Sequence, residues 1–166
     1  LEFRRVLFRS ERTRLLDLTD RAYKANAWCG PSLLEALEGI SPAMAAKHPI
    51  KGGNSIWQLV DHVASWNIVV TQRMQGLTPH VPAEFNFPPT PKPTPAAWKA
   101  TLKRLAASHA MFRREIARFP EAKFGRKRPK VDATWSVLIY GQVEHCLYHA
   151  GQVALLRRAL GKPIVS

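Results

Sequence analysis

Apolar residues recur at helical spacing in four stretches of the chain, and no stretch shows the strict apolar–polar alternation that is typical of a strand. The clearest stretch is 95–119, where apolar positions follow one another in steps of four and three residues and so share one face of a helix. Residues 11–39, 55–75 and 133–160 show similar periodicity, and a glycine followed by a proline interrupts the first of them. The pattern predicts an all-α fold with four helices.

Residues that commonly cap helices stand at the ends of these stretches. Ser55, followed three residues later by a glutamine, has the form of a capping box. Thr94 precedes a proline at the first helical position, and Asp132 or Thr134 is the expected cap of the last helix. Gly161 follows that helix and is a typical helix stop.

The segment between the second and third predicted helices, residues 77–95, contains seven prolines. Proline lacks a backbone donor and disrupts helices, so we expect no helix in this segment. A connection of this length in a helical bundle either crosses the bundle or folds over its end. The sequence therefore predicts an up-and-down four-helix bundle with one long proline-rich crossover.

Composition agrees with a single globular domain. A chain of 166 residues can bury one sizeable core, and 46% hydrophobic with 22% charged residues is ordinary for a soluble protein. No apolar run approaches the roughly 20 residues that cross a bilayer, and the start lacks a signal-peptide pattern, so we expect a cytoplasmic protein with no membrane partner. Two cysteines, Cys29 and Cys146, are too few for a disulfide framework, and we expect reduced, mostly buried thiols.

The start of the chain differs in character from the rest. Residues 4–10 resemble the translation of a common sequencing adapter. We therefore interpret residues 1–10 as a foreign segment and residues 11–166 as the single domain.

The chain is strongly basic, with a net charge of +13. A basic loop at 123–130 and a basic third helix have the charge of a phosphate-binding surface. Their basic residues are not interleaved with aromatic residues, however, and the sequence has no helix-turn-helix signature. A solvated basic face is the favoured interpretation, and nucleic acid is not the expected partner.

Three histidines are the strongest candidates for chemistry. His145 and His149 lie four residues apart in the last predicted helix, so their imidazoles point the same way, and each can bring a nitrogen to about 2.0–2.1 Å from one metal ion. His62, on the apolar face of the second predicted helix, is the candidate third ligand. The alternative is three hydrogen-bonded core histidines. A metalloprotease signature is excluded, because Cys146 stands where that signature requires glutamate.

Segments 27–37, 55–66 and 145–157 resemble the DinB-like family, whose members are small metal-binding helical bundles. The resemblance covers nearly the whole chain after the adapter-like start. It implies a four-helix bundle with one long crossover that is often a homodimer. It also implies one divalent metal ion, zinc or nickel, held by three histidines.

By position in the family pattern, the metal ligands are His62, His145 and His149. The chain departs from the pattern at Cys29, where a histidine is expected. A thiolate at this position would line the pocket or bind the metal, and burial as an inert thiol is the favoured alternative.

Further residues near the predicted ligands each have two interpretations. Gln152 and Gln142 share the ligand face, where they either orient a water or substrate at the metal or form helix–helix hydrogen bonds. Trp66 is a pocket wall or a core residue. Arg73 is a pocket cation for an anionic substrate or, as the favoured interpretation, a solvated residue at a helix end. His109 is expected to be a core histidine.

Three neutral imidazoles leave an open coordination position, which is typical of a catalytic metal site. Some relatives within this family's wider fold are thiol-dependent transferases or isomerases. By this resemblance, our first hypothesis is a metal-dependent S-transferase that acts on a small molecule and a low-molecular-weight thiol. Gln152 or Tyr148 would assist the reaction. The second is a metal-dependent hydrolase, which lacks an evident carboxylate base beside the histidines. The third is a basic nucleic-acid-binding or structural protein without catalysis.

Overall fold

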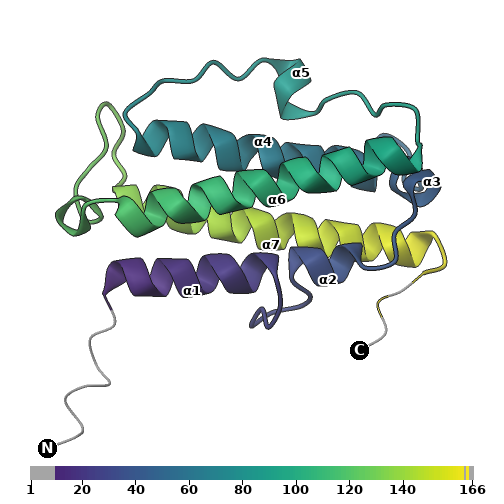
Figure 1. Ribbon diagram of the computed structural model, residues 1–166, viewed down its shortest axis with the longest axis horizontal. Helices are drawn as coiled ribbons and strands as arrows, with labels where there is room; N and C mark the ends of the chain where they lie inside the picture. Colours follow the sequence, from purple (N-terminus) through teal and green to yellow (C-terminus); the bar gives the residue numbers. More distant parts are fainter. Residues whose placement is uncertain (1–9, 163, 165–166) are drawn as a thin grey trace, which may run out of the picture.

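Four long helices lie side by side in the computed structural model, which describes residues 10–162 and 164 (Figure 1). They are α1 (Glu11–Tyr23), α4 (Ile56–Met74), α6 (Pro95–Arg118) and α7 (Trp135–Ala159). The described part of the chain contains no strand, so the predicted all-α bundle is confirmed. None of its helices has both the length and the apolar character that crossing a bilayer requires.

The connector between α4 and α6 is a true crossover. It leaves the C-terminal end of α4, runs back along that helix and enters α6 at the opposite end of the bundle (Figure 1). As a result α4 and α6 run in the same direction, whereas α1 and α7 run opposite to them. The predicted long proline-rich crossover is confirmed.

The connector also contains a short helix, α5 (Ala83–Asn86), so the expectation of no helix there was wrong. The five residues between Pro82 and Pro88 all keep their backbone N–H groups, which leaves room for one helical turn. Two further short elements were not predicted: α3 (Pro42–Ala45), and a 3-10 turn at Glu121–Lys123.

The first predicted stretch is divided into α1 and α2 (Leu33–Leu37), which lie nearly end to end beside α7 (Figure 1). Asn26 and Gly30 adopt positive φ angles of 63° and 69° in the intervening loop, which ends the helical path. The adapter-like segment lies outside the described residues except for Ser10, whose hydroxyl caps α1.

Helix caps hold α4, α6 and α7 at their N-termini as the sequence indicated. The predicted capping box is present. The backbone N–H of Gln58 donates to Ser55 Oγ at 3.2 Å, and the backbone N–H of Ser55 donates to Gln58 Oε1 at 3.0 Å. Thr94 caps α6, and Thr134 caps α7. The alternative cap, Asp132, was wrong, because its carboxylate instead pairs with a lysine in the preceding loop.

The helix α4 is the most deeply buried element, because α6 and α7 pack against it and the connector runs over a further face (Figure 1). Apolar residues such as Trp57 and Val63 are fully buried. Several polar side chains of α4 are buried as well: Asp61, His62, Ser65, Asn67 and Thr71. Each of these needs a hydrogen-bond partner inside the protein.

His109 packs in the core between α1 and α6, as predicted. Its ring stacks on Tyr23 with centroids 3.8 Å apart, and its Nε2 lies 3.6 Å from the Asp20 carboxylate without a hydrogen bond. Burial lowers the pKa of His109 to about 4; Asp20 opposes this shift, while Lys24 and Arg113 add to it. The ring is therefore neutral in the folded protein at neutral pH.

Replacing His109 with phenylalanine should make the protein less sensitive to acid. The unfolded chain binds a proton at the ordinary histidine pKa of 6.5, whereas the folded protein binds it near pH 4, so the free energy of unfolding falls as the pH decreases through this window. Phenylalanine keeps the stacking on Tyr23 but cannot bind the proton. Urea unfolding across the window should show a smaller loss in His109→Phe, and an equal loss would contradict this role.

Candidate metal centre

Three histidines from two helices meet at one point inside the bundle. His62 comes from the middle of α4, and His145 and His149 come from successive turns of α7. The Nε2 atom of His145 lies 2.9 Å from Nε2 of His62 and 2.9 Å from Nε2 of His149. The three potential ligand atoms all lie within 4.8 Å of one another. The structure thus brings together the three residues that the sequence singled out.

Hydrogen bonds at the far side of two rings decide which nitrogen faces the centre. His62 Nδ1 lies 2.7 Å from the backbone carbonyl oxygen of Asn86, and His149 Nδ1 lies 2.6 Å from Oε1 of Gln152. Both partners are acceptors, so both Nδ1 atoms carry the proton. The Nε2 atoms of these two neutral rings consequently point their lone pairs at the centre.

The third ring cannot satisfy both neighbours. A neutral His145 has one N–H, so its Nε2 can donate to His62 or to His149 but not to both. Its own Nδ1 is buried and has no hydrogen-bond partner among the described residues. At least one contact therefore sets two lone pairs against each other. A cation between the rings removes this conflict, because it accepts all three lone pairs at once.

The spacing of the nitrogens also fits a metal ion. Tetrahedral nitrogen ligands about 2.0–2.1 Å from zinc lie about 3.4 Å from one another. The two Nε2 separations of 2.9 Å at His145 are about half an ångström shorter, and all three ligand atoms lie within 4.8 Å of one another, so small movements of the rings reach this spacing. The three-histidine group can therefore hold a divalent ion.

Burial keeps the three rings in the form that binds metal. It lowers the pKa of His62, lowers that of His149 to about 4 and, together with the two neighbouring rings, lowers that of His145 to about 3. Imidazole binds a metal through a neutral nitrogen. Protons therefore compete little for these lone pairs at neutral pH.

The connector supplies part of the site that sequence analysis missed. Asn86 accepts from His62 through its backbone oxygen and from Trp66 Nε1 through its side-chain oxygen at 2.9 Å. Phe87 stacks on the His62 ring with centroids 4.1 Å apart. The only signal for these residues was the short proline-free window within the connector. The helix α5 thus fixes the orientation of His62.

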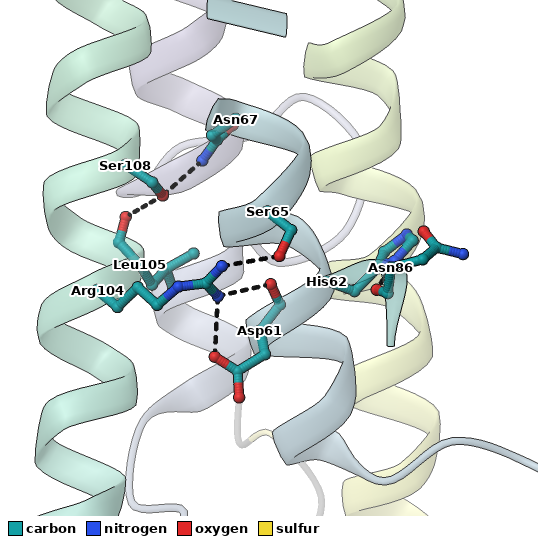
Figure 2. A network of polar contacts seen from close by, with 8 residues as sticks. All are labelled: Asp61, His62, Ser65, Asn67, Asn86, Arg104, Leu105 and Ser108. Carbon is teal, nitrogen blue, oxygen red and sulfur yellow. Dashed lines mark hydrogen bonds and ion pairs between the residues drawn. The ribbon is translucent and has the colours of Figure 1, made fainter. Parts of the chain in front are cut away.

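On its opposite side, α4 is held by Arg104 from α6 (Figure 2). One guanidinium nitrogen donates to both the backbone oxygen and the carboxylate of Asp61, each at 3.0 Å, and the other donates to Ser65 Oγ at 2.8 Å. Because Asp61 directly precedes His62, this contact sets the rotation and height of α4 at the ligand. Arg104 is therefore a positioning residue for the site.

A second polar chain ties α7 to α4 and α6. Gln142 Nε2 donates to Asn67 Oδ1 at 2.9 Å, and Asn67 Nδ2 donates to Ser108 Oγ at 3.2 Å, as Figure 2 shows in part. Gln142 therefore acts as a helix–helix contact, which was one of its two expected roles.

Gln152 and Tyr148 form the outer support of His149. Gln152 accepts from His149 Nδ1, and its Nε2 donates to the Tyr148 hydroxyl oxygen at 3.0 Å. Tyr148 itself is exposed. Gln152 thus orients a candidate ligand on its own helix, which differs from both expected roles, a contact with water or substrate and a helix–helix hydrogen bond.

A cavity of about 470 Å³ lies between α4 and α7 and reaches the histidines. His62 and His145 line one end, and Trp66 forms part of its wall. Arg73 also lines it and is partly buried, so the expectation of a solvated helix-end residue was wrong. Cys29 is exposed and is not among the lining residues, so the expectation of a buried or pocket thiol there was also wrong.

The fold and this geometry define a helical bundle with a buried three-histidine group that can hold a metal ion. The sequence profile of the DinB superfamily matches residues 27–153, and the chain belongs to this superfamily. The family resemblance noted from the sequence is thereby confirmed. No curated protein and no solved structure shows significant similarity to the chain.

Replacing Arg104 with alanine should destabilise the bundle. The change leaves the mostly buried Asp61 carboxylate without its partner and should lower the free energy of unfolding by about 2–3 kcal/mol. Arg104→Lys keeps the charge but cannot reach all three acceptors, so its free energy of unfolding should lie between those of the wild type and Arg104→Ala. Lys103→Ala, on the exposed side of α6, is the control in chemical denaturation. A loss no larger than that of the control would show that this contact does not stabilise the bundle.

Replacing Gln152 with leucine should weaken metal binding roughly tenfold or more, because nothing then holds the proton on His149 Nδ1. The measurement is competition for Zn²⁺ and Ni²⁺ against a chelator of known affinity. Gln152→Glu keeps an acceptor and should retain the affinity. Tyr148→Phe removes only the outer hydroxyl and should have a smaller effect. Unchanged affinity in Gln152→Leu would show that the hydrogen bond does not support the ligand.

Proposed function

We propose that this protein binds one divalent ion, Zn²⁺ or Ni²⁺, through His62, His145 and His149 and acts as a metal-dependent thiol S-transferase on a small molecule. One observation carries the proposal: three imidazole nitrogens converge with more lone pairs than protons, beside a cavity that a ligand can enter. Three histidines are the ligand set of open, catalytic metal sites.

The chemistry follows from that arrangement. A divalent ion held by the three rings would lower the pKa of a thiol that coordinates it, which makes the thiol a nucleophile at neutral pH. In the transfer the sulfur forms a bond to an electrophilic carbon, the leaving group departs with the electrons of the broken bond, and the thiol proton passes to solvent.

The chain's own residues orient the ligands and shape the entrance. Asn86 and Gln152 hold the Nδ1 protons of His62 and His149, so that both Nε2 atoms remain free. Trp66 and Phe87 enclose His62 with aromatic surface, which limits water on that side.

Thiol transfer is favoured over hydrolysis because hydrolysis requires a general base beside the reacting water. No aspartate or glutamate lines the described cavity at the histidines. The acidic residue adjacent to His62 in sequence, Asp61, is engaged by Arg104 on the other side of α4 (Figure 2). A nucleophile that the ion itself activates needs no such base.

The test combines metal content with turnover. Protein made without a histidine tag and loaded with Zn²⁺ or Ni²⁺ should contain one ion per chain by elemental analysis, and His149→Ala should lose it. The loaded protein should accelerate the reaction of cysteine or glutathione with 1-chloro-2,4-dinitrobenzene, and His149→Ala should abolish this acceleration. His109→Phe, which changes a histidine outside the group, should retain both properties.

The two readouts separate the two parts of the proposal. An ion content that is unchanged in His149→Ala would refute the metal site. If the protein binds the ion but accelerates no reaction between a thiol and any electrophile of a broad panel, the transferase proposal is refuted while the metal site is retained.

A further inference from the structure

The cavity that reaches the histidines has two arginines at its other end. Arg73 comes from the last turn of α4, and Arg128 comes from the loop between α6 and α7. Both side chains are partly buried. Within the described part of the chain, neither guanidinium forms an ion pair, and Nε of Arg128 is buried without a hydrogen-bond partner.

Other arginines of the bundle that are partly or fully buried have partners. Arg104 binds Asp61 and Arg113 binds Asp20, while Arg157 donates to backbone carbonyl oxygens. Partly buried cations are normally paired in this way, because their desolvation has to be compensated. Arg73, whose only neighbour of this kind is the face of the Trp66 ring, and Arg128 have no such acceptor among the described residues, and they occur together in one cavity.

The electrostatics of this end favour an anion. The two guanidinium groups repel each other, and burial together with the charge of Arg128 lowers the pKa of Arg73. No carboxylate lines the described cavity to offset the two charges. An anionic ligand between the arginines would relieve this repulsion and satisfy the open donors.

The position of Arg73 limits the size of the ligand. Its guanidinium carbon lies 5.5 Å from the centre of the Trp66 ring, and that centre lies 6.0 Å from the centre of the His145 ring. The separation of the guanidinium from His145 is therefore smaller than the two distances combined. A single small molecule can span it.

The wall between the two ends is apolar. Val70 from α4 and Val137 and Leu138 from α7 line the cavity between the histidines and the arginines. A molecule that fits this surface has an apolar body with a negatively charged group at one end.

We propose that Arg73 and Arg128 form an anion subsite that binds the carboxylate or phosphate group of a small amphiphilic substrate, whose apolar part lies along Val70 and Leu138 and whose reactive group reaches the histidines. The assignment of the reacting end rests on the proposed function, whereas anion binding by the arginine pair does not. The anion subsite restricts the expected substrates to organic anions.

Binding of octanoate and octyl phosphate to the 166-residue chain tests the subsite, with uncharged octanamide as the matched probe. Calorimetry, supported by the intrinsic fluorescence of the five tryptophans, of which Trp66 lies beside Arg73, should show that both anions bind and that octanamide binds much more weakly. Arg73→Gln combined with Arg128→Gln should weaken anion binding roughly ten- to a hundredfold, the value of hydrogen bonds to charged groups. Each single variant should lose a smaller factor, which keeps the test valid if the double variant fails to fold.

Two controls separate this subsite from bulk charge and from the metal centre. Arg126→Gln removes an exposed arginine of the same loop and should leave anion binding unchanged. His149→Ala should retain anion binding even if it loses metal. The test of the subsite is therefore independent of the proposed reaction. Equal binding of octanamide, absence of anion binding to the wild type, or unchanged binding in the arginine variants would overturn the proposal. An equal loss in Arg126→Gln would do the same.

Discussion

The burial of α4 is the constraint on which the rest of the structure depends. A helix covered by α6, α7 and the connector cannot leave its polar side chains to water, so each of them needs a partner from a neighbouring element. Asp61 and Ser65 accept hydrogen bonds from Arg104, and Asn67 forms hydrogen bonds with Gln142 and Ser108. These contacts also fix how α4 is rotated against its neighbours.

His62 is the exception within this set, because only one of its two ring nitrogens has a well-matched hydrogen-bond partner. Its Nδ1 is satisfied by the connector, while its Nε2 faces another ring nitrogen across 2.9 Å. An ordinary core would place an apolar side chain or a single donor there. Three converging imidazoles instead leave a polar conflict in the interior, and binding sites are where a protein is expected to depart from good packing.

Sequence analysis identified the long helices and the pair His145 and His149 because both depend on local periodicity, whereas His62 was added from its place on an apolar helix face and from the family resemblance. The capping box at Ser55 and the seam of α6 are contained in the sequence itself, and residues four apart on α7 must share a face. The roles of Asn86 and Arg104 could not be predicted, because they arise from contacts between elements far apart in the chain. Arg73 was misjudged for the same reason, since a helix end is solvated only when no loop covers it.

The connector explains why the site lies at this level of the bundle. A crossover that runs back along α4 brings a segment with little helical signal against the middle of that helix, where its backbone oxygens are not used by regular structure (Figure 1). Asn86 offers one such oxygen to His62, and its side chain holds Trp66, so one residue sets both the ligand and the cavity wall. The buried members of the two core clusters come from outside this segment, which adds only the partly buried Phe87, so changes in the segment should alter the site more than they alter the bundle.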